Sequence, residues 1–294
     1  MKSVIVIGVT GMVGQAVYQE SIKRGYDVKG IARSDAEISI DIKDADILEE
    51  NLDKYAPDLI INCAAVVDLA WCENNPKEAH DINVAPVNTM ANYVRKTGAT
   101  LVQLSSDQFY PNDLGAIQHR EIDSVRPSNK YAENKLDAEK MCRELNAYVV
   151  RTNVTGCRGH ASLTFFEWAT QAIEANESIK GFQDFYTSTI DRHSLARYLF
   201  DLVESAATAG IYNIASSQVS NKHEFLSQLA IELGFKGRKI EKCSVDELWP
   251  IRCKACGLDV TKIENTIGKK MPDLRQVLKH LIEDRKMTRK GIYV

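Results

Sequence analysis

The sequence predicts an α/β fold with a doubly wound parallel sheet, and two observations support this prediction. In the first half of the chain, short runs rich in Val, Ile and Leu alternate with longer stretches whose apolar residues recur every three or four positions. A glycine-rich turn directly follows the first of these runs. Strands that alternate with helices imply a parallel sheet whose two faces are both covered by helices.

The elements of the first half follow one another in this alternating order. The β-branched runs predict strands over residues 4–7, 27–32, 59–62, 101–104 and 148–151. The stretches between them predict helices over residues 12–24, 44–55, 77–96 and 129–145. Pro86 lies inside the third helix, so we expect a kink or a broken turn there.

In the second half the alternation loosens. Helical spacing predicts helices over residues 162–176, 194–205, 223–233, 260–267 and 274–285, with short strands between them such as 210–214. We therefore expect a main domain over residues 1–155, its sheet completed by later segments, and a smaller C-terminal α/β lobe over residues 156–294. The basic segment 284–294 is expected to be a solvated tail.

Length and charge exclude several classes of protein. A chain of 294 residues can bury a large core without disulfide or metal staples. Its 37 Lys and Arg against 40 Asp and Glu leave a net charge of −3, with both signs interspersed, so no global field attracts nucleic acid or an anionic membrane. No apolar run approaches the ~20 residues of a membrane span, and residues 1–8 lack the length and cleavage site of a secretory signal. We expect a cytoplasmic protein with no nucleic-acid or membrane partner.

The cysteines do not form a disulfide framework. Seven of them are scattered along the chain, which predicts reduced thiols. Cys253 and Cys256 have the spacing of half a zinc site or of a redox pair, but no second Cys/His pair lies at a matching distance. The sequence therefore predicts no metal site.

The glycine-rich turn predicts a Rossmann-like dinucleotide site. Gly8 can take the tight turn, Gly11 lets the backbone approach a pyrophosphate, and Gly14 allows close packing of helix on strand. The free N–H groups and the dipole of the helix that starts here favour an anion. The spacing is Gly-x-x-Gly-x-x-Gly, and its position after the first strand strengthens the prediction.

The end of the second predicted strand discriminates between the two nicotinamide cofactors. An acid at this position bonds the ribose hydroxyl of NAD, whereas a base accommodates the 2′-phosphate of NADP. Arg33 stands at the tip and can pair with a phosphate, which favours NADPH. In the alternative, Arg33 is solvated and Asp35 serves the ribose, which leaves NADH open.

Three side chains predict carbonyl reduction. Tyr131 and Lys135 lie four residues apart on one face of a helix, so the lysine charge would lower the pKa of the phenol and make it a proton donor to a carbonyl oxygen. Ser106 follows a buried strand, at the sheet edge where ligands bind, and its hydroxyl can bond the same oxygen. A plain turn-capping role for Ser106 is the structural alternative.

Together these motifs resemble the extended short-chain dehydrogenase/reductases over nearly the whole chain, and among them most resemble the dTDP-4-dehydrorhamnose reductases. The resemblance rests on five short segments besides the Tyr/Lys helix: Thr10-Gly11-Met12-Val13-Gly14, Asn62-Cys63-Ala64-Ala65, Ser105-Ser106-Asp107, Gly210-Ile211-Tyr212-Asn213 and Leu258-Asp259-Val260-Thr261. It implies NADPH-dependent reduction of the 4-keto group of a nucleotide-activated 6-deoxy sugar, for the biosynthesis of cell-surface polysaccharide.

The resemblance also implies a role for each matching residue. Tyr131 would be the acid, Lys135 its charge partner and a ribose ligand, and Ser106 the donor to the carbonyl oxygen. Asp107 and Asn153 would contact the sugar of a nucleotide-diphosphate-sugar substrate, held mainly by the C-terminal lobe. The cofactor residues implied are Gly8, Thr10, Gly11, Met12, Val13, Arg33, Asp41, Ile42, Cys63, Ala64, Ala65 and Val66, besides Tyr131 and Lys135.

The sequence departs from the resembled pattern at a few positions and leaves alternatives open. Gln108 replaces a common tyrosine, and the segment 151–156 lacks an aromatic residue that such reductases often carry. A 4-epimerase or dehydratase with tightly held NAD, and a non-catalytic regulatory subunit, are the alternative functions. A homodimer is also left open. The substrate diphosphate predicts a local basic cluster drawn from Arg192, Lys222, Arg252 and Lys254.

Overall fold

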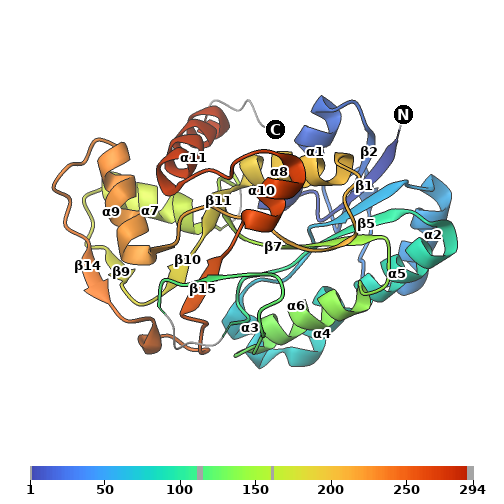
Figure 1. Cartoon of the computed structure of the whole chain (residues 1–294), viewed down its shortest axis with the longest axis horizontal. Helices are drawn as coiled ribbons and strands as arrows, with labels where there is room; N and C mark the ends of the chain where they lie inside the picture. Colours follow the sequence, from blue (N-terminus) through green and yellow to red (C-terminus); the bar gives the residue numbers. More distant parts are fainter. Residues whose placement is uncertain (1, 111–114, 160–161, 290–294) are drawn as a thin grey trace.

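A sheet of seven parallel strands forms the centre of the computed structural model, which describes residues 2–110, 115–159 and 162–289 (Figure 1). Along the sheet the strands are β12 (Gly210–Asn213), β7 (Ala147–Arg151), β5 (Thr100–Leu104), β4 (Leu59–Asn62), β1 (Ser3–Ile7), β2 (Asp27–Ala32) and β3 (Ile38–Ser39). From β1 the chain runs outward in both directions. This confirms the predicted doubly wound α/β class, and the order reverses between β1 and β4, where such sheets bind ligands.

Helices cover both faces of this sheet, and the side chains of β1 show why. Val4 and Val6 point into one core, shared with α1 (Met12–Lys23) and α8 (Arg192–Glu204). Ile5 and Ile7 point into the other core, shared with α2 (Ala45–Tyr55), α5 (Ala85–Thr97) and α6 (Lys130–Met141). Because successive strand residues face opposite sides, a continuous apolar strand needs a helical layer on each side.

Local signals set where several helices begin and end. The helix predicted over 77–96 is divided into α4 (Pro76–Asn83) and α5, which separate at Val84, and Pro86 lies in the first turn of α5. The helices predicted over 129–145 and 162–176 begin later, because Asn129 caps α6 and Thr164 caps α7 (Phe165–Glu174), and both also end earlier than predicted. The short α3 (Leu69–Asn74), capped by Asp68, was not predicted.

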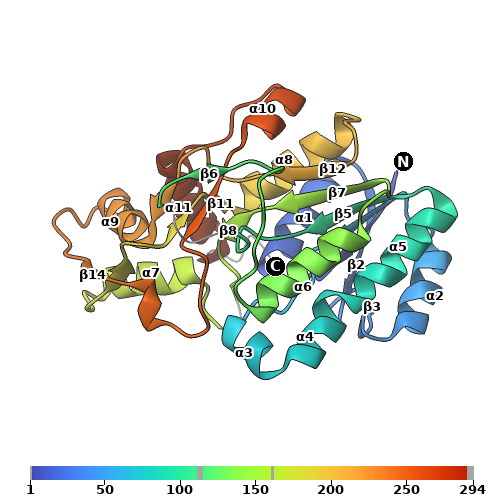
Figure 2. The ribbon, with the colours of Figure 1, turned by 60° about the horizontal axis from the view of Figure 1, so that its bottom comes forward.

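The second lobe consists of short strands together with helices such as α7 (Figure 2). Its largest sheet has the order β13 (Ser220–Asn221), β10 (Tyr186–Thr187), β15 (Ala255–Leu258) and β6 (Gln118–His119). Two smaller pairs are β8 (Asn153–Thr155) with β11 (Thr189–Asp191), and β9 (Lys180–Phe182) with β14 (Glu241–Cys243). This lobe also contains α9 (Lys222–Glu232), a short 3-10 helix (Val245–Glu247) and α11 (Leu274–Arg289), whereas α10 (Thr261–Ile267) packs on α8 and β12 of the central domain.

The chain crosses between the two lobes repeatedly. Strand β6 comes from the first half of the sequence but pairs with β15 in the second lobe. Strand β12 and helix α8 come from the second half, yet β12 pairs with β7 in the central sheet and α8 packs on α1. No single position in the sequence separates the residues of one lobe from those of the other.

Two expectations about the second half are wrong. The segment from residue 284 onward is not a solvated tail as far as it is described, because α11 continues to Arg289 and buries Asp284 and Arg285; residues 290–294 lie outside the described part. Cys253, just before strand β15, and Cys256, within it, form a buried disulfide where reduced thiols were expected. Throughout the described residues, no helix is long and apolar enough to cross a membrane.

Candidate active site

The glycine-rich turn joins β1 to α1 and needs its glycines. Gly8 has a φ of +80°, and a side chain there would meet the backbone of Ala64 at 2.8 Å. A Cβ on Gly14 would lie 2.0 Å from the carbonyl oxygen of Gly8. Gly11 is the N-cap residue of α1, so Met12 and Val13 open the helix, where N–H groups have no partner within the helix. The turn is therefore packed tightly against Ala64 and the first turn of α1, and the N–H groups at the start of α1 stay available to a ligand.

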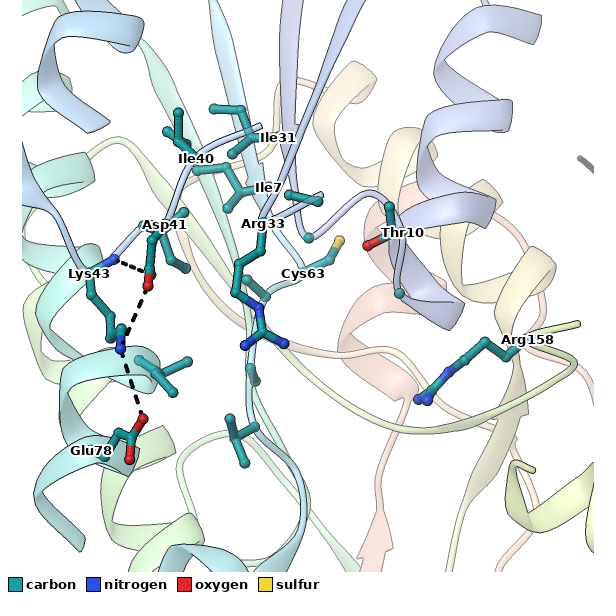
Figure 3. A pocket seen from close by; sticks show the side chains of 18 residues that line it. Ile7, Thr10, Ile31, Arg33, Ile40, Asp41, Lys43, Cys63, Glu78 and Arg158 are labelled. Atoms are coloured by element: carbon teal, nitrogen blue, oxygen red, sulfur yellow. Dashed lines mark hydrogen bonds and ion pairs between the residues drawn. The ribbon is translucent and has the colours of Figure 1, made fainter. Parts of the chain in front are cut away.

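A cavity of about 350 Å³ opens at this turn, at the carboxyl ends of β1, β2 and β4 (Figure 3). Ten of the predicted cofactor residues line it: Gly8, Thr10, Gly11, Arg33, Asp41, Ile42, Cys63, Ala64, Ala65 and Val66. Met12 and Val13 are not part of its lining and stand at the start of α1 beside it. The lining also includes residues that the sequence analysis missed, namely Ile40, Lys43, Glu78, Ile82 and Arg158.

Charged residues surround this cavity unevenly. Lys43 lies between two carboxylates, 3.6 Å from Asp41 and 3.8 Å from Glu78, so these three charges largely satisfy one another. Arg33 extends from the tip of β2 into the cavity. Asp35, the alternative ribose ligand, lines a neighbouring cavity instead. This arrangement favours an anionic group beside Arg33 over a ribose held by Asp35.

Ser106 and Tyr131 come together beside this cavity. Ser106 follows β5, and its hydroxyl donates to Asp107 Oδ1 at 3.4 Å. Tyr131 lies in the first turn of α6, near enough to Ser106 for that side chain to act on the titration of the phenol. Lys135 lies one turn further along α6. Its positive charge is close enough to Cys63, which lines the cavity, to favour the thiolate form of that residue. All three predicted catalytic residues are buried.

A buried ion-pair network fixes α6 against the sheet. Glu139, two turns after Tyr131, accepts hydrogen bonds from Arg151 at 2.9 and 2.8 Å and from the hydroxyl of Ser105 at 2.6 Å. At the other end of the helix, Asn129 accepts from the Ala132 N–H and donates to the carbonyl oxygen of Ile251. Tyr131 is thereby held in a fixed position relative to Ser106.

Burial dominates the titration of these groups. It raises the pKa of Tyr131 well above its usual range, and the nearby Ser106 side chain offsets this only in part. The expected lowering of the Tyr131 pKa by Lys135 is therefore not found. Burial also lowers the pKa of Lys135 to about 8, although nearby Cys63 and Glu139 favour its charged form.

The residues predicted to contact a sugar extend from this centre toward the second lobe. Asp107 accepts hydrogen bonds from Gln108 Nε2 at 3.1 Å and from Asn153 Nδ2 at 2.9 Å. Thr189 donates to Asn153 Oδ1 at 2.7 Å, and Lys222 Nζ donates to Thr189 at 3.3 Å. The Lys222 ammonium also lies 5.1 to 5.7 Å from the ring centres of three aromatic residues, Phe165, Phe185 and Phe225.

The predicted basic cluster is half correct. Lys222 and Arg252 lie close enough for their charges to interact, and the positive charge of Lys222 favours the ionised form of Asp107. Arg192 instead forms a buried bidentate pair with Asp284, and Lys254 pairs with acidic residues of its own lobe. Asp284 and Asp184 lie far from Arg192 and Lys254 in the sequence, so spacing alone did not reveal these pairs. In the described part of the chain, no group of three His, Cys, Asp or Glu residues could hold a metal ion.

Comparison with known proteins matches this architecture. The family described as RmlD substrate binding domain matches residues 1–287. A probable low-salt glycan biosynthesis reductase, Agl14, from Haloferax volcanii is 26% identical over 286 residues, covering 93% of this chain and 95% of that protein. Methionine adenosyltransferase 2 subunit beta from Bos taurus is 31% identical over 159 residues, covering 52% of this chain and 47% of that protein. The structure of dTDP-4-dehydrorhamnose reductase from Bacillus anthracis in complex with NADP superposes with a TM-score of 0.87 at 21% identity, covering 96% and 99% of the two chains.

Proposed function

The chain belongs to the RmlD substrate binding domain family, and on this premise we propose that it is an NADPH-dependent reductase of the 4-keto group of a nucleotide-activated 6-deoxy sugar. The observation that carries the proposal is that Ser106 and Tyr131 meet in one buried site, with Lys135 one turn further along the same helix. This set lies between the dinucleotide-type cavity and the polar side chains around Asp107. The names of the Haloferax volcanii and Bacillus anthracis proteins, both reductases, support the reaction class.

The residues of the cavity fit a dinucleotide phosphate. Ile31 and Ile42 supply apolar walls suited to an adenine, and Arg33 supplies a guanidinium for the 2′-phosphate. Among the described residues, the Nε of Arg158 is buried without a hydrogen-bond partner, as expected of a donor whose acceptor is the ligand. When bound, NADPH would supply a hydride to the carbonyl carbon of the substrate.

The chain itself supplies the proton and the orientation. The hydroxyl of Ser106 would donate a hydrogen bond to the carbonyl oxygen, and Tyr131 would transfer its phenolic proton to that oxygen. The phenolate that remains carries a negative charge in a buried site, where the Lys135 ammonium stabilises it. The high pKa of free Tyr131 matches a group that keeps its proton until the carbonyl oxygen begins to gain charge.

The substrate side favours an anionic sugar conjugate. Lys222 and Arg252 provide two neighbouring positive charges for a diphosphate, and Asp107 and Asn153 provide polar atoms for sugar hydroxyls. We propose that residues 1–155 supply the catalytic side chains and all of the cofactor site except Arg158, while residues 156–294 mainly select the sugar. The name of the Haloferax volcanii protein, a glycan biosynthesis reductase, supports a place in polysaccharide biosynthesis. A cytoplasmic location and a homodimer stay predictions.

A regulatory subunit is the second candidate, favoured by the similarity of half the chain to the beta subunit of methionine adenosyltransferase 2. The complete Ser106, Tyr131 and Lys135 set argues for catalysis instead, because a purely regulatory chain does not need it. An epimerase or dehydratase would retain NAD, whereas Arg33 suits NADPH.

A direct assay tests the proposal. The purified protein is incubated with NADPH and a panel of 4-keto-6-deoxy nucleotide sugars, and loss of the nicotinamide absorbance is followed together with product mass. We expect oxidation of NADPH with at least one sugar and a mass gain of two hydrogens. Absence of turnover with the whole panel contradicts a reductase, and stoichiometric NAD released on denaturation would instead indicate the epimerase or dehydratase.

A further inference from the structure

Arg158 reaches the cofactor cavity from the second lobe. It follows β8 by a few residues, is half-buried, and lines both the main cavity and the neighbouring one on the far side of Thr10. Figure 3 shows its guanidinium directed into the cavity from the side opposite Asp41 and Lys43. Its Nη1 donates to Ser162 Oγ at 3.5 Å, whereas its Nε is buried and, within residues 2–110, 115–159 and 162–289, has no hydrogen-bond partner.

We propose that Arg158 binds the diphosphate of the dinucleotide, and that Asp284 of the C-terminal helix positions it; this inference rests on the proposed function. NADPH carries two anionic groups, the 2′-phosphate and the diphosphate. The cavity offers two guanidinium groups, Arg33 at the tip of β2 and Arg158 beside the glycine-rich turn. Since the diphosphate belongs at the start of α1, it falls to Arg158, and the 2′-phosphate to Arg33.

The backbone that carries Arg158 is anchored on one side by α7. The N–H groups of Arg158 and Gly159 each donate to Glu167 Oε1 at 3.2 Å. Glu167 belongs to the capping box of α7, and its partner Thr164 donates to the carbonyl oxygen of Gly156 at 2.7 Å. The guanidinium therefore starts from a fixed backbone, which lowers the entropy lost when it binds a phosphate.

Asp284 anchors the same segment from the other side and connects it to the glycine-rich turn. Its Oδ2 accepts from the Cys157 N–H at 3.2 Å, and its two oxygens accept from Arg192 at 2.9 and 2.7 Å. Arg192 in turn donates to Gln15 Oε1 at 3.0 Å, and Gln15 donates to the carbonyl oxygen of Thr10 at 3.3 Å. One buried carboxylate thus holds the two walls between which the diphosphate would lie.

Binding measurements with paired variants test the assignment. The dissociation constants of NADPH, NADH and ADP-ribose are measured by calorimetry for the unmodified protein, Arg158→Gln and Arg33→Gln. We expect Arg158→Gln to weaken all three ligands by a similar factor of about 10 to 100, the value of a lost charge-assisted hydrogen bond. Arg33→Gln should weaken NADPH alone. Unchanged affinities in Arg158→Gln, or a loss confined to NADPH, would overturn the diphosphate assignment.

The role of Asp284 is tested by a double-mutant cycle. Asp284→Asn should weaken NADH binding several-fold when Arg158 is present and have little further effect in the Arg158→Gln background. Equal losses in both backgrounds would mean that Asp284 supports the fold without positioning Arg158. If Asp284→Asn does not fold, the same double-mutant cycle is carried out with Glu167→Ala, which removes the acceptor of the Arg158 and Gly159 N–H groups. Binding needs no turnover, so a chain that passes these tests but reduces no sugar contradicts only the proposed reaction.

Discussion

Lys222 and Asp107 lie at opposite ends of one hydrogen-bonded chain that crosses from the second lobe to the central sheet. The chain runs from Lys222 through Thr189 and Asn153 to Asp107, with distances of 3.3, 2.7 and 2.9 Å. Burial raises the pKa of Asp107 to about 6 and lowers that of Lys222 to about 8, while each residue favours the charged form of the other. Both groups therefore titrate near the neutral range.

Replacing Lys222 by Met should shift the pH dependence of the reaction. Loss of the nearby positive charge raises the pKa of Asp107 above about 6. If ionised Asp107 accepts hydrogen bonds from the sugar, the acidic limb of kcat/KM moves to higher pH. Lys222→Arg keeps the charge and should leave that limb in place. A limb that is the same in Lys222→Met would show that Asp107 does not control it.

Tyr131→Phe should remove the proton donor while leaving the cofactor cavity intact. We expect kcat to fall by about 10² to 10⁴, the usual contribution of a positioned general acid, with the dissociation constant of NADPH nearly unchanged. Stopped-flow single turnovers separate the two effects. If Tyr131→Phe fully replaces the unmodified protein in cells that depend on it, the result would instead support the regulatory subunit.

The cost of burying the Lys135 ammonium should make the free energy of unfolding rise with pH. Burial lowers its pKa to about 8, whereas a free lysine titrates near ~10.4. Between these values the unfolded chain binds more protons than the folded one, so the free energy of unfolding rises across this interval. Lys135→Met should abolish that rise and stabilise the protein near neutral pH by up to about 3 kcal/mol, while it lowers turnover. Urea unfolding on both sides of this pH interval measures the difference, and identical pH dependence in the two proteins would contradict the shift.

Gly14→Ala should destabilise the protein strongly. The added Cβ would lie 2.0 Å from the carbonyl oxygen of Gly8, a contact between two backbones that only movement of α1 can relieve. We expect a loss of at least ~1 to 3 kcal/mol, as for other overpacked sites. Gly11→Ala is the matched control, because its Cβ would meet the same oxygen at 3.2 Å and faces the ligand side. It should fold but bind NADPH more weakly; thermal unfolding and calorimetry distinguish the two.

The sequence predicted six strands of the central sheet well because each has four to six residues and most of these are buried; it missed the two-residue edge strand β3. The predicted strand over 59–62 coincides with β4, and that over 27–32 coincides with β2. Most strands of the second lobe have two or three residues, too few for a periodic pattern. Their partners are also distant, as when β6 pairs with β15.

The candidate site was predictable where a motif sets the local geometry. The glycine turn and the Tyr131/Lys135 pair fall into this group, and ten of the predicted cofactor residues line one cavity. Arg158 carries no such signal, because its position depends on the distant residues Glu167 and Asp284. The direction of the shift in the Tyr131 pKa could not be predicted from the sequence either, since it depends on how deeply the phenol is buried.

The repeated crossing of the chain between lobes has a practical consequence for changing the sugar that such an enzyme accepts. The second lobe cannot be exchanged as one continuous segment. Its strand β6 comes before α6 and β7 of the central domain in the sequence, and strand β12 of the central sheet lies between two segments of the second lobe. A graft would have to transplant several separate segments and preserve every junction. For the same reason, any opening of one lobe against the other must bend several backbone connections at once, which favours small adjustments over a wide hinge.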